Sequence, residues 1–197
     1  AIAESLLLLS RADAGRLLLD LTLVDVCEIV RACAEDAEIL AEERHISIEK
    51  NLPGSIWGKV DAGRLNQILW NLLDNAIKYN EQGGKVEIRA GTDPVQRLVW
   101  IEIGNSGPGI PAVLAPQLFE RFFRSDPRGV VEGHGLGLSL SRELARAHGG
   151  DVVLLSSCDG WTAFRVTLKL VVSRASAAPQ SIDGRLPAAG VSLARNK

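Results

Sequence analysis

Two asparagines and a lysine share one face of the helix that we expect over residues 61–79. At about 100° per residue, Asn75 falls about 40° from Asn71, and Lys78 falls about 20° to the other side. Asparagine is a poor helix former because its side chain competes for backbone hydrogen bonds. A carboxamide oxygen is a hard, neutral ligand suited to Mg²⁺, and a lysine supplies a point charge for phosphates. The alternative is an ordinary solvated polar stripe.

Two glycine-rich turns could bring a ligand close to the backbone. In the first, a strand-like run ends at Asn105 and is followed by Gly107 and Gly109. In the second, residues 132–138, three glycines stand directly ahead of an expected helix. Backbone amides at a helix N-terminus bind anions, and glycine lets phosphates approach closely. The second turn has neither the P-loop nor the dinucleotide spacing, so alone it indicates either a phosphate contact or simple flexibility.

The segment between these turns is both aromatic and basic. Its phenylalanines and arginines are Phe119, Phe122, Phe123, Arg121, Arg124 and Arg128. The aromatic rings can pin a mobile segment to the core, and the guanidinium groups can reach a phosphate. For any single arginine, an ordinary surface position is the alternative.

The elements around these motifs are predicted from apolar periodicity. Helices are expected over residues 2–9 with a stop at Gly15, and over 25–43, 61–79 and 135–148, with short helical pieces in 114–123. Strands are expected over residues 45–52, 85–92, 97–104, 151–157 and 161–172. This order predicts an α/β (α+β) two-layer sandwich, in which a mixed, mostly antiparallel sheet of about five strands is covered on one face by helices.

The overall composition fits a globular domain with a sizeable core. The chain has 197 residues, is 46% hydrophobic and carries a net charge of −2, which gives no indication of nucleic-acid binding. Its longest aliphatic run is too short to span a bilayer, so we expect no membrane-spanning segment in this chain. Three cysteines without framework spacing predict reduced, buried thiols in a cytoplasmic setting.

In combination, these motifs resemble the ATP-binding catalytic domain of sensor histidine kinases. That domain belongs to a superfamily shared with DNA gyrase, the MutL repair proteins and the cytosolic chaperone ATPases. "NQILWNLLDNAIKYN" is similar to the asparagine box of the family, "NSGPGI" to its first glycine box and "GHGLGL" to its second. The resemblance covers about residues 1–172 and implies ATP and Mg²⁺ as cofactors.

The resemblance also implies roles for individual residues. Asn75 would coordinate Mg²⁺ with Asn71 assisting, and Lys78 with Arg124 would contact the phosphates. The further nucleotide-binding residues would be Tyr79, Asn105, Gly107, Gly109, Ile110, Arg121, Gly133, Gly135, Leu136, Gly137, Leu138 and Thr162. Residues 119–134 would form a lid over ATP.

Asn105 departs from the usual family pattern. Most relatives place aspartate here, and its carboxylate accepts a hydrogen bond from the adenine amino group. Asparagine still accepts through its carbonyl oxygen, so we expect ATP affinity to fall only about fivefold. Asparagine at this position also suggests the group of kinases that resemble heavy-metal sensors.

Position 71 bears on the choice between kinase and hydrolase. Hydrolysing members of the superfamily carry a glutamate one helical turn before the Mg²⁺-binding asparagine, whereas this chain has Asn71. An amide is not a useful base near neutral pH, so phosphoryl transfer to an external acceptor is favoured over hydrolysis. An ATPase without kinase activity and a nucleotide-binding scaffold remain the alternatives, the latter because of Asn105.

The phosphate acceptor of such a kinase is a histidine beside an acidic residue on a separate helix. His45, His134 and His148 do not fit that setting. We expect residues 1–15 to be the end of a dimerisation helix, 16–172 the catalytic domain and 173–197 a disordered tail. The parent protein is expected to be a homodimer anchored in the inner membrane, with this domain in the cytoplasm and a response regulator receiver domain as its partner.

Overall fold

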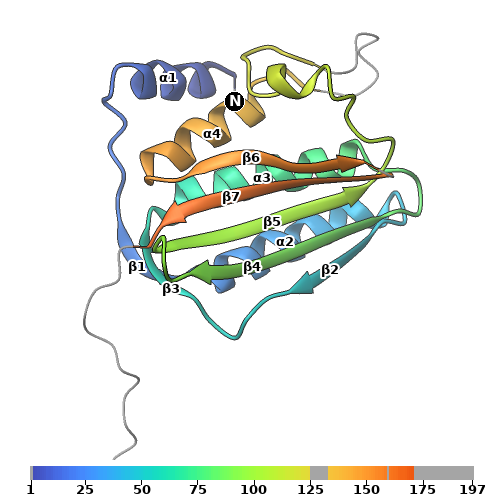
Figure 1. Cartoon of the computed structure of the whole chain (residues 1–197), viewed down its shortest axis with the longest axis horizontal. Helices are drawn as coiled ribbons and strands as arrows, with labels where there is room; N and C mark the ends of the chain where they lie inside the picture. The colour runs from blue at the N-terminus through green and yellow to red at the C-terminus, as the bar shows by residue number, and fades with distance from the viewer. Residues whose placement is uncertain (1, 125–132, 159, 171–197) are drawn as a thin grey trace, which may run out of the picture.

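The computed structural model describes residues 2–124, 133–158 and 160–170 (Figure 1). Its helices are α1 (Ile2–Asp13), α2 (Val26–Glu42), α3 (Ala62–Lys78) and α4 (Gly137–Ala147), with a short 3₁₀ turn η1 (Ala115–Gln117). Its strands are β1 (Thr22–Asp25), β2 (Ser47–Asn51), β3 (Trp57–Val60), β4 (Lys85–Asp93), β5 (Leu98–Ser106), β6 (Asp151–Cys158) and β7 (Trp161–Lys169). The expected tail and part of the expected lid lie outside the described residues.

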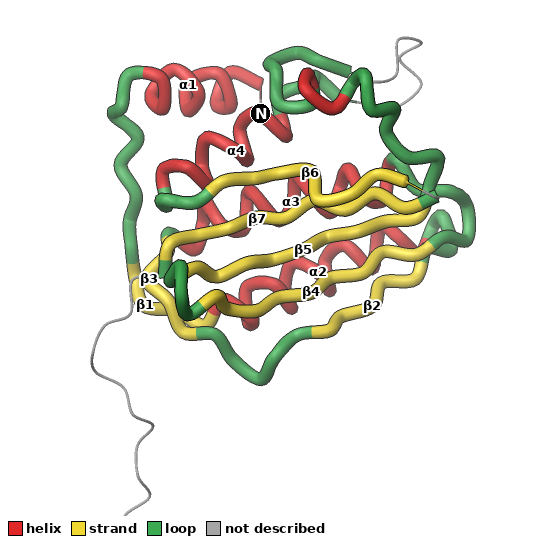
Figure 2. Tube along the Cα trace, viewed as in Figure 1, coloured by secondary structure: helices red, strands yellow, loops and turns green. Residues whose placement is uncertain are grey.

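The fold is a two-layer α/β sandwich, which confirms the predicted fold class. Five strands form one sheet in the order β2-β4-β5-β7-β6. Strands β2 and β4 run parallel, and the other neighbours are antiparallel. Helices α2, α3 and α4 lie side by side on one face, and α1 packs along α4 (Figures 1 and 2).

Local capping explains where the two long helices begin. The Asp25 side chain accepts hydrogen bonds from the amides of Cys27 at 3.0 Å and Ile56 at 2.9 Å, so it starts α2 and also holds a distant loop. The Asp61 side chain accepts from the amide of Arg64 at 3.0 Å and starts α3. Both aspartates satisfy amides that the first helical turn leaves unpaired.

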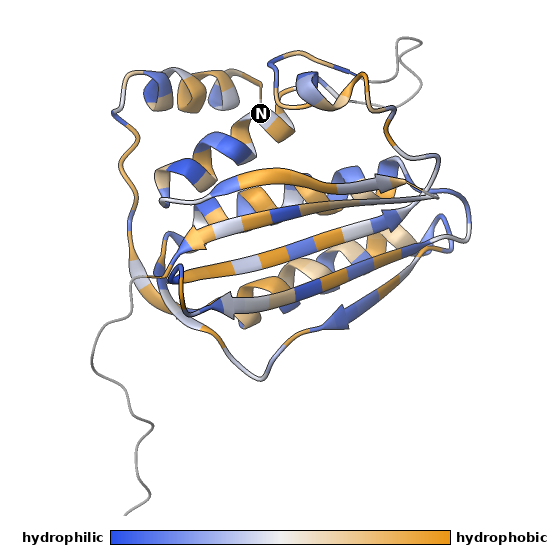
Figure 3. Ribbon diagram, viewed as in Figure 1, coloured by the Kyte–Doolittle hydropathy of each residue, from blue (hydrophilic) through white to orange (hydrophobic). Residues whose placement is uncertain are grey.

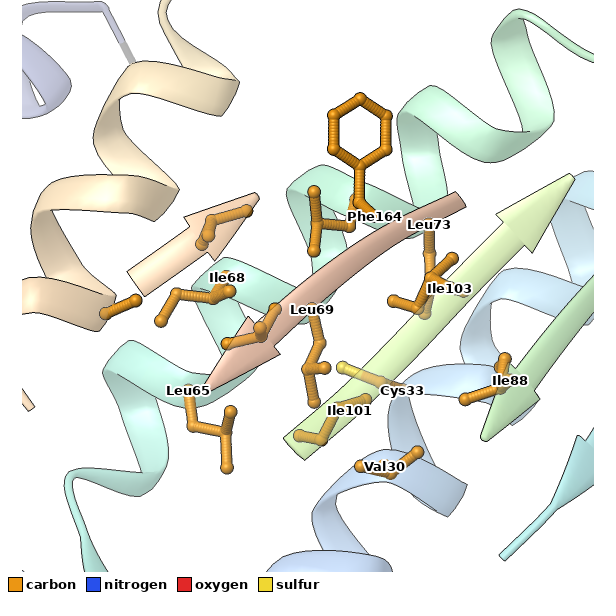
Figure 4. Packing of buried hydrophobic residues seen from close by; sticks show 14 of the residues in the cluster. Val30, Cys33, Leu65, Ile68, Leu69, Leu73, Ile88, Ile101, Ile103 and Phe164 are labelled. Atoms are coloured by element: carbon orange, nitrogen blue, oxygen red, sulfur yellow. The ribbon is translucent and has the colours of Figure 1, made fainter. Parts of the chain in front are cut away.

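The core lies between α2, α3 and α4 and the helix-facing side of the sheet. Alternate residues of β5 and β7 point into it, as the alternation of hydropathy along the strands indicates (Figure 3). Ile101 and Ile103 of β5 belong to one buried cluster with Leu65, Leu69 and Leu73 of α3, and all five are at most 2% exposed (Figure 4). This packing fixes how far α3 stands from β5, and therefore the width of any space between their ends.

The outer face of the sheet carries two tryptophans that lie over glycines. A Cβ atom added to Gly91 would come within 2.4 Å of the Trp100 ring, and one added to Gly104 would come within 2.5 Å of the Trp161 ring. Between them, Glu102 is only 5% exposed and is paired with Arg165 and, at 2.9 Å, with Arg89. Both glycines are therefore required by packing on this face.

A two-stranded ribbon of β1 and β3 was not predicted. Its strands have four residues each and pair Thr22 with Val60 and Asp25 with Trp57. Segments this short carry no clear period, and the partners are far apart in the sequence. The ribbon joins α1 to the sandwich at the end remote from the glycine-rich turns (Figure 1).

The prediction of three buried thiols is correct for two of them. Cys27 and Cys33 are buried, whereas Cys158 is exposed near the end of β6. Burial, followed by the nearby Asp36 carboxylate, raises the pKa of the Cys33 thiol to about 11. Burial, followed by the nearby Asp25 carboxylate, also raises the pKa of Cys27. These two thiols therefore stay protonated and unreactive near neutral pH.

Candidate nucleotide-binding site

A cavity of about 430 Å³ opens between the C-terminal half of α3, the N-terminal end of α4 and the ends of β5 and β7. Most of the predicted site residues line it, namely Asn71, Asn75, Lys78, Tyr79, Asn105, Gly109, Ile110, Arg124, Gly133, Gly135, Leu136, Gly137, Leu138 and Thr162. Segments that are distant in the sequence therefore meet around one space, which is large enough for a small-molecule ligand.

Helix α3 forms the polar wall of the cavity. Asn75 and Lys78 both face the cavity, and the Lys78 Nζ atom lies 2.7 Å from an Asp74 carboxylate oxygen. The Asn71 amide nitrogen donates to the carbonyl of Gly137 at 3.3 Å and to the Ser141 hydroxyl at 3.1 Å. Asn71 thus holds α3 against the start of α4, and its carbonyl oxygen is the group that it can offer a ligand.

The strands form the opposite end of the cavity (Asn105, Thr162 and Ile110), which we call the base end because the family resemblance places an adenine base there. Asn105 of β5 and Thr162 of β7 are directly opposite in the antiparallel register. The Ser157 hydroxyl lies 3.1 Å from the Thr162 hydroxyl and accepts from the Ile110 amide at 2.5 Å. The Asn105 amide nitrogen donates to the carbonyl of Ser106 at 2.8 Å. These bonds leave the Asn105 carbonyl oxygen as the acceptor that it can offer a ligand.

In the second glycine-rich turn, Gly135 must be glycine because of contacts within the protein. Gly135 has φ +67°, and a Cβ atom there would lie 2.6 Å from backbone atoms of Phe122 and Phe123. The Phe122 amide donates to the Gly135 carbonyl at 2.8 Å. The turn is therefore bonded to the aromatic segment that precedes it, directly ahead of the N-terminus of α4.

Two predicted residues do not line the cavity. Arg121 is paired with Asp13 of α1 at 2.6 Å. Gly107, with φ +147°, packs against the Tyr79 carbonyl, which a Cβ atom would approach to 2.6 Å. The structure thus gives Gly107 a packing reason for being glycine.

Several cavity residues were not among the predicted site residues. Helical spacing places Gln67 and Asp74 on the polar face of α3, within roughly 60° of Asn71, but it assigned them no role in binding. Ile2 and Ser5 also line the cavity because α1 folds back over α4, and nothing in their local sequence indicates this. His134 also lines the cavity, whereas His148 is buried at the C-terminal end of α4.

The polar atoms of the cavity suit a hard cation shared with phosphates. The α3 wall offers carboxamide and carboxylate oxygens from Asn71, Asn75 and Asp74, and Lys78 and Arg124 supply positive charge. No group of three or more His, Cys, Asp and Glu side chains with metal-binding geometry occurs among the described residues. A set of two carboxamides and one carboxylate fits Mg²⁺ that keeps several waters and binds through phosphates, rather than an all-protein metal cage.

Together, the sandwich and its cavity define an ATPase-type nucleotide-binding domain, and sequence comparison agrees. Residues 60–172 match the family described as histidine kinase-, DNA gyrase B-, and HSP90-like ATPase, and the chain belongs to this family. The particular relatives are sensor histidine kinases. The chain is 31% identical to the sensor histidine kinase TmoS of Ectopseudomonas mendocina over 170 residues, which are 85% of this chain and 17% of TmoS. It is 33% identical to WalK of Bacillus subtilis over 57% of this chain and 19% of WalK.

Solved structures of histidine kinases have the same fold. The chain matches AdeS of Acinetobacter baumannii with a TM-score of 0.72 and 25% identity, over 86% of this chain and 77% of AdeS. It matches ShkA, solved in complex with AMPPNP, with a TM-score of 0.75 and 28% identity, over 87% of this chain and 35% of ShkA. This chain is therefore an ATP-binding catalytic domain of the histidine kinase type. It spans less than a fifth of the length of TmoS and of WalK.

Proposed function

We propose that this domain transfers the γ-phosphate of ATP to a histidine on a dimerisation domain, for relay to a response regulator. The observation that carries this proposal is Asn71, which stands one turn before Asn75 and already donates two hydrogen bonds to α4. An amide fixed in this way cannot take a proton from water, so hydrolysis has no base at this position. Transfer by positioning and charge neutralisation needs none.

The roles of the cavity residues follow from their chemistry. Mg²⁺, when bound, neutralises phosphate charge, and Asn75 would hold it with Asn71 assisting. Lys78 and Arg124 would contact the phosphates, and Lys78 must exchange Asp74 for them. Asn105 would accept from the adenine amino group beside Thr162, with Tyr79, Ile110 and Leu136 against the nucleotide. The other glycines and leucines of the second turn would border the phosphates at the start of α4.

The acceptor histidine belongs to another domain in this proposal. His148 is buried and bonded through both ring nitrogens, to the Asp61 amide at 3.1 Å and the Leu144 carbonyl at 2.8 Å. His45 lies in the turn after α2, and His134 lines the cavity. Residues 1–15 would be the end of a dimerisation helix, 16–172 the catalytic domain and 173–197 a tail.

The parent protein would act as a homodimer on a receiver domain, from the cytoplasmic side of the inner membrane. Within residues 2–124, 133–158 and 160–170, no helix combines the length and apolarity needed to cross a membrane.

Nucleotide titration with and without Mg²⁺, followed by addition of a matched acceptor domain, tests the proposal. We expect Mg²⁺-dependent ATP binding, no phosphoramidate on the isolated chain, and transfer from labelled ATP once the acceptor is added. Steady phosphate release without an acceptor would instead support an ATPase. No binding at millimolar ATP would support a scaffold. A stable phosphoramidate on the chain alone would contradict the proposal that the acceptor histidine belongs to another domain.

A further inference from the structure

Arg44 lies outside the cavity, yet it contacts the end of the helix that carries the polar wall. It stands in the turn between α2 and β2, and one guanidinium nitrogen donates to the carbonyls of Ile77 and, at 3.0 Å, Lys78. The other terminal nitrogen donates to the carbonyl of Asn80 at 2.9 Å. A single side chain therefore contacts three backbone carbonyls, two in the last turn of α3 and one on Asn80, beyond the end of the helix.

These contacts match what the end of a helix requires. The last four carbonyls of a helix have no partner within it, and the aligned peptide dipoles make that end partly negative. A guanidinium group answers both needs because it is a permanent cation with several donors in a fixed plane. Lysine would supply the charge at a single point and could not reach all three carbonyls in the same way.

A second set of bonds joins the same place to the exit of β5. The Asn80 side chain donates to the Lys85 carbonyl at 3.1 Å and accepts from the Ser106 hydroxyl at 2.8 Å. A Cβ atom on Gly84 would come within 2.2 Å of the Asn80 side chain, so only glycine fits there. We call Arg44, Asn80, Gly84 and Ser106 the α3 corner.

The α3 corner adjoins residues that line the cavity. Arg44 donates to the carbonyl of Lys78, which lines the cavity together with Tyr79, and Ser106 follows Asn105 in the chain. The position of the Lys78 ammonium therefore depends on how firmly the final turn of α3 is held. A misplacement of about 1 Å in a positioning contact can cost on the order of 100-fold in an enzyme reaction, so a small loosening is measurable.

We propose that Arg44 is a positioning residue, which fixes the last turn of α3 so that Lys78 meets the phosphates of a nucleoside triphosphate. This inference rests on the proposed function of the cavity. It gives Arg44 a place in nucleotide recognition although its side chain does not touch the nucleotide. It also implies that the turn between α2 and β2 tunes phosphate affinity with little effect on the base.

The first experiment compares two conservative substitutions. In Arg44→Lys we expect ATP affinity to fall about three- to tenfold and adenosine affinity to change less than twofold, because phosphate contacts are lost and base contacts remain. Arg31→Lys is the matched control, since Arg31 donates to the loop carbonyls of Pro53 at 3.0 Å and Gly54 at 2.8 Å, outside the cavity. ATP affinity equal to that of the control would overturn the proposal.

The second experiment asks whether Arg44 acts through Lys78. In a Lys78→Ala background, Arg44→Lys should weaken ATP binding by less than twofold, because the contact that it positions is already gone. An undiminished three- to tenfold loss in that background would show that Arg44 only supports the fold in general. Melting temperatures of all variants, measured without nucleotide, separate loss of fold from loss of affinity.

A third measurement needs no substitution. In the wild-type chain, saturating ATP should slow hydrogen exchange of the Arg44 guanidinium protons and leave those of Arg31 unchanged, as followed by NMR. Equal behaviour of the two arginines would contradict the proposal, including in the case that Arg44→Lys does not fold. If the wild-type chain itself binds no ATP, the proposed function fails first, and that failure is visible before any variant is made.

Discussion

The two ends of the cavity are formed by different kinds of secondary structure. At the base end, Asn105 and Thr162 are held by the register of neighbouring strands and by hydrogen bonds to adjacent groups. At the other end (Asn71, Asn75, Lys78, Arg124 and residues 133–138), the side chains stand on the C-terminal half of α3, the loop residue Arg124 and the glycine turn before α4. We call it the phosphate end because the proposed function places the phosphates there. Lys78 there is already paired with Asp74.

This difference indicates how the two halves of a nucleotide would be bound. The base end presents acceptors whose positions are set before any ligand arrives, so binding there costs little reorganisation. Under the proposed function, the phosphate end would have to give up an internal ion pair, so we expect its affinity for phosphates to depend on Mg²⁺ and on the exact placement of α3. Substitutions at the base end should affect ATP and adenosine alike, whereas those at the phosphate end should affect ATP alone.

The largest loss of ATP affinity is expected from a substitution at the phosphate end. Asn75→Ala should weaken Mg-ATP binding roughly 100-fold, because a direct metal ligand is lost while alanine keeps the helix. Adenosine affinity should stay within about twofold of the wild type. Calorimetric titration with each ligand, with and without Mg²⁺, measures both quantities. A similar loss for adenosine would mean that the cavity does not divide into two ends.

A smaller loss is expected at the base end. Thr162→Val removes the hydroxyl that lies against Ser157 with little change in volume, and should weaken ATP and adenosine equally, by about tenfold. Thr167→Val is the matched control, because the Thr167 hydroxyl bonds to Asp151 on the same pair of strands, away from the cavity. A loss for ATP without a loss for adenosine would assign Thr162 to the phosphates.

Asn105→Asp is expected to raise the affinity for both ATP and adenosine severalfold. A carboxylate accepts the adenine amino group in a charge-assisted bond, so ATP and adenosine should both bind about fivefold more tightly. Asn51→Asp, on the exposed edge strand β2, adds the same charge away from the cavity and should leave both affinities unchanged. Unchanged or weaker binding by Asn105→Asp would show that this residue does not face adenine.

The last substitution, at Asp151, lies at neither end of the cavity and should change stability without changing ATP binding. Burial raises the pKa of the Asp151 carboxyl, but hydrogen bonds from Arg142 and the Val152 amide outweigh it and lower the pKa below its ordinary 3.8. The stabilisation is therefore complete above about pH 3.8 and is lost as the pH falls through the lowered value. Asp151→Asn should lower the free energy of unfolding by about 1 kcal/mol at pH 7, and this difference should shrink in acid.

Urea unfolding between pH 7 and pH 3 measures this difference. A difference that stays constant over the range would mean that the charge of Asp151 is not involved. ATP affinity at pH 7 should not change. A changed ATP affinity would show that Arg142, which also stacks 4.6 Å from the centre of the Phe119 ring, transmits to the cavity.

Much of this molecule could be predicted from its sequence because its signals are local. The polar face of α3, the glycines before α4 and the alternation of β7 each lie within one element, and they led to the correct fold and to most of the cavity wall. What escaped prediction depends on distant partners. The β1–β3 ribbon, the return of α1 over α4 and the pairing of Arg121 with Asp13 all join segments that share no local pattern.

The indole of Trp161 has a consequence for how this domain can change over time. Because that ring fills the place of a side chain at Gly104, neither position can vary alone without opening a gap or creating a clash. We expect descendants of this sequence to replace both residues together or neither, and the same for Gly91 and Trp100. Gly104 directly precedes Asn105, so an invariant glycine there would be mistaken for a nucleotide contact, although its constraint comes from the opposite face of the sheet.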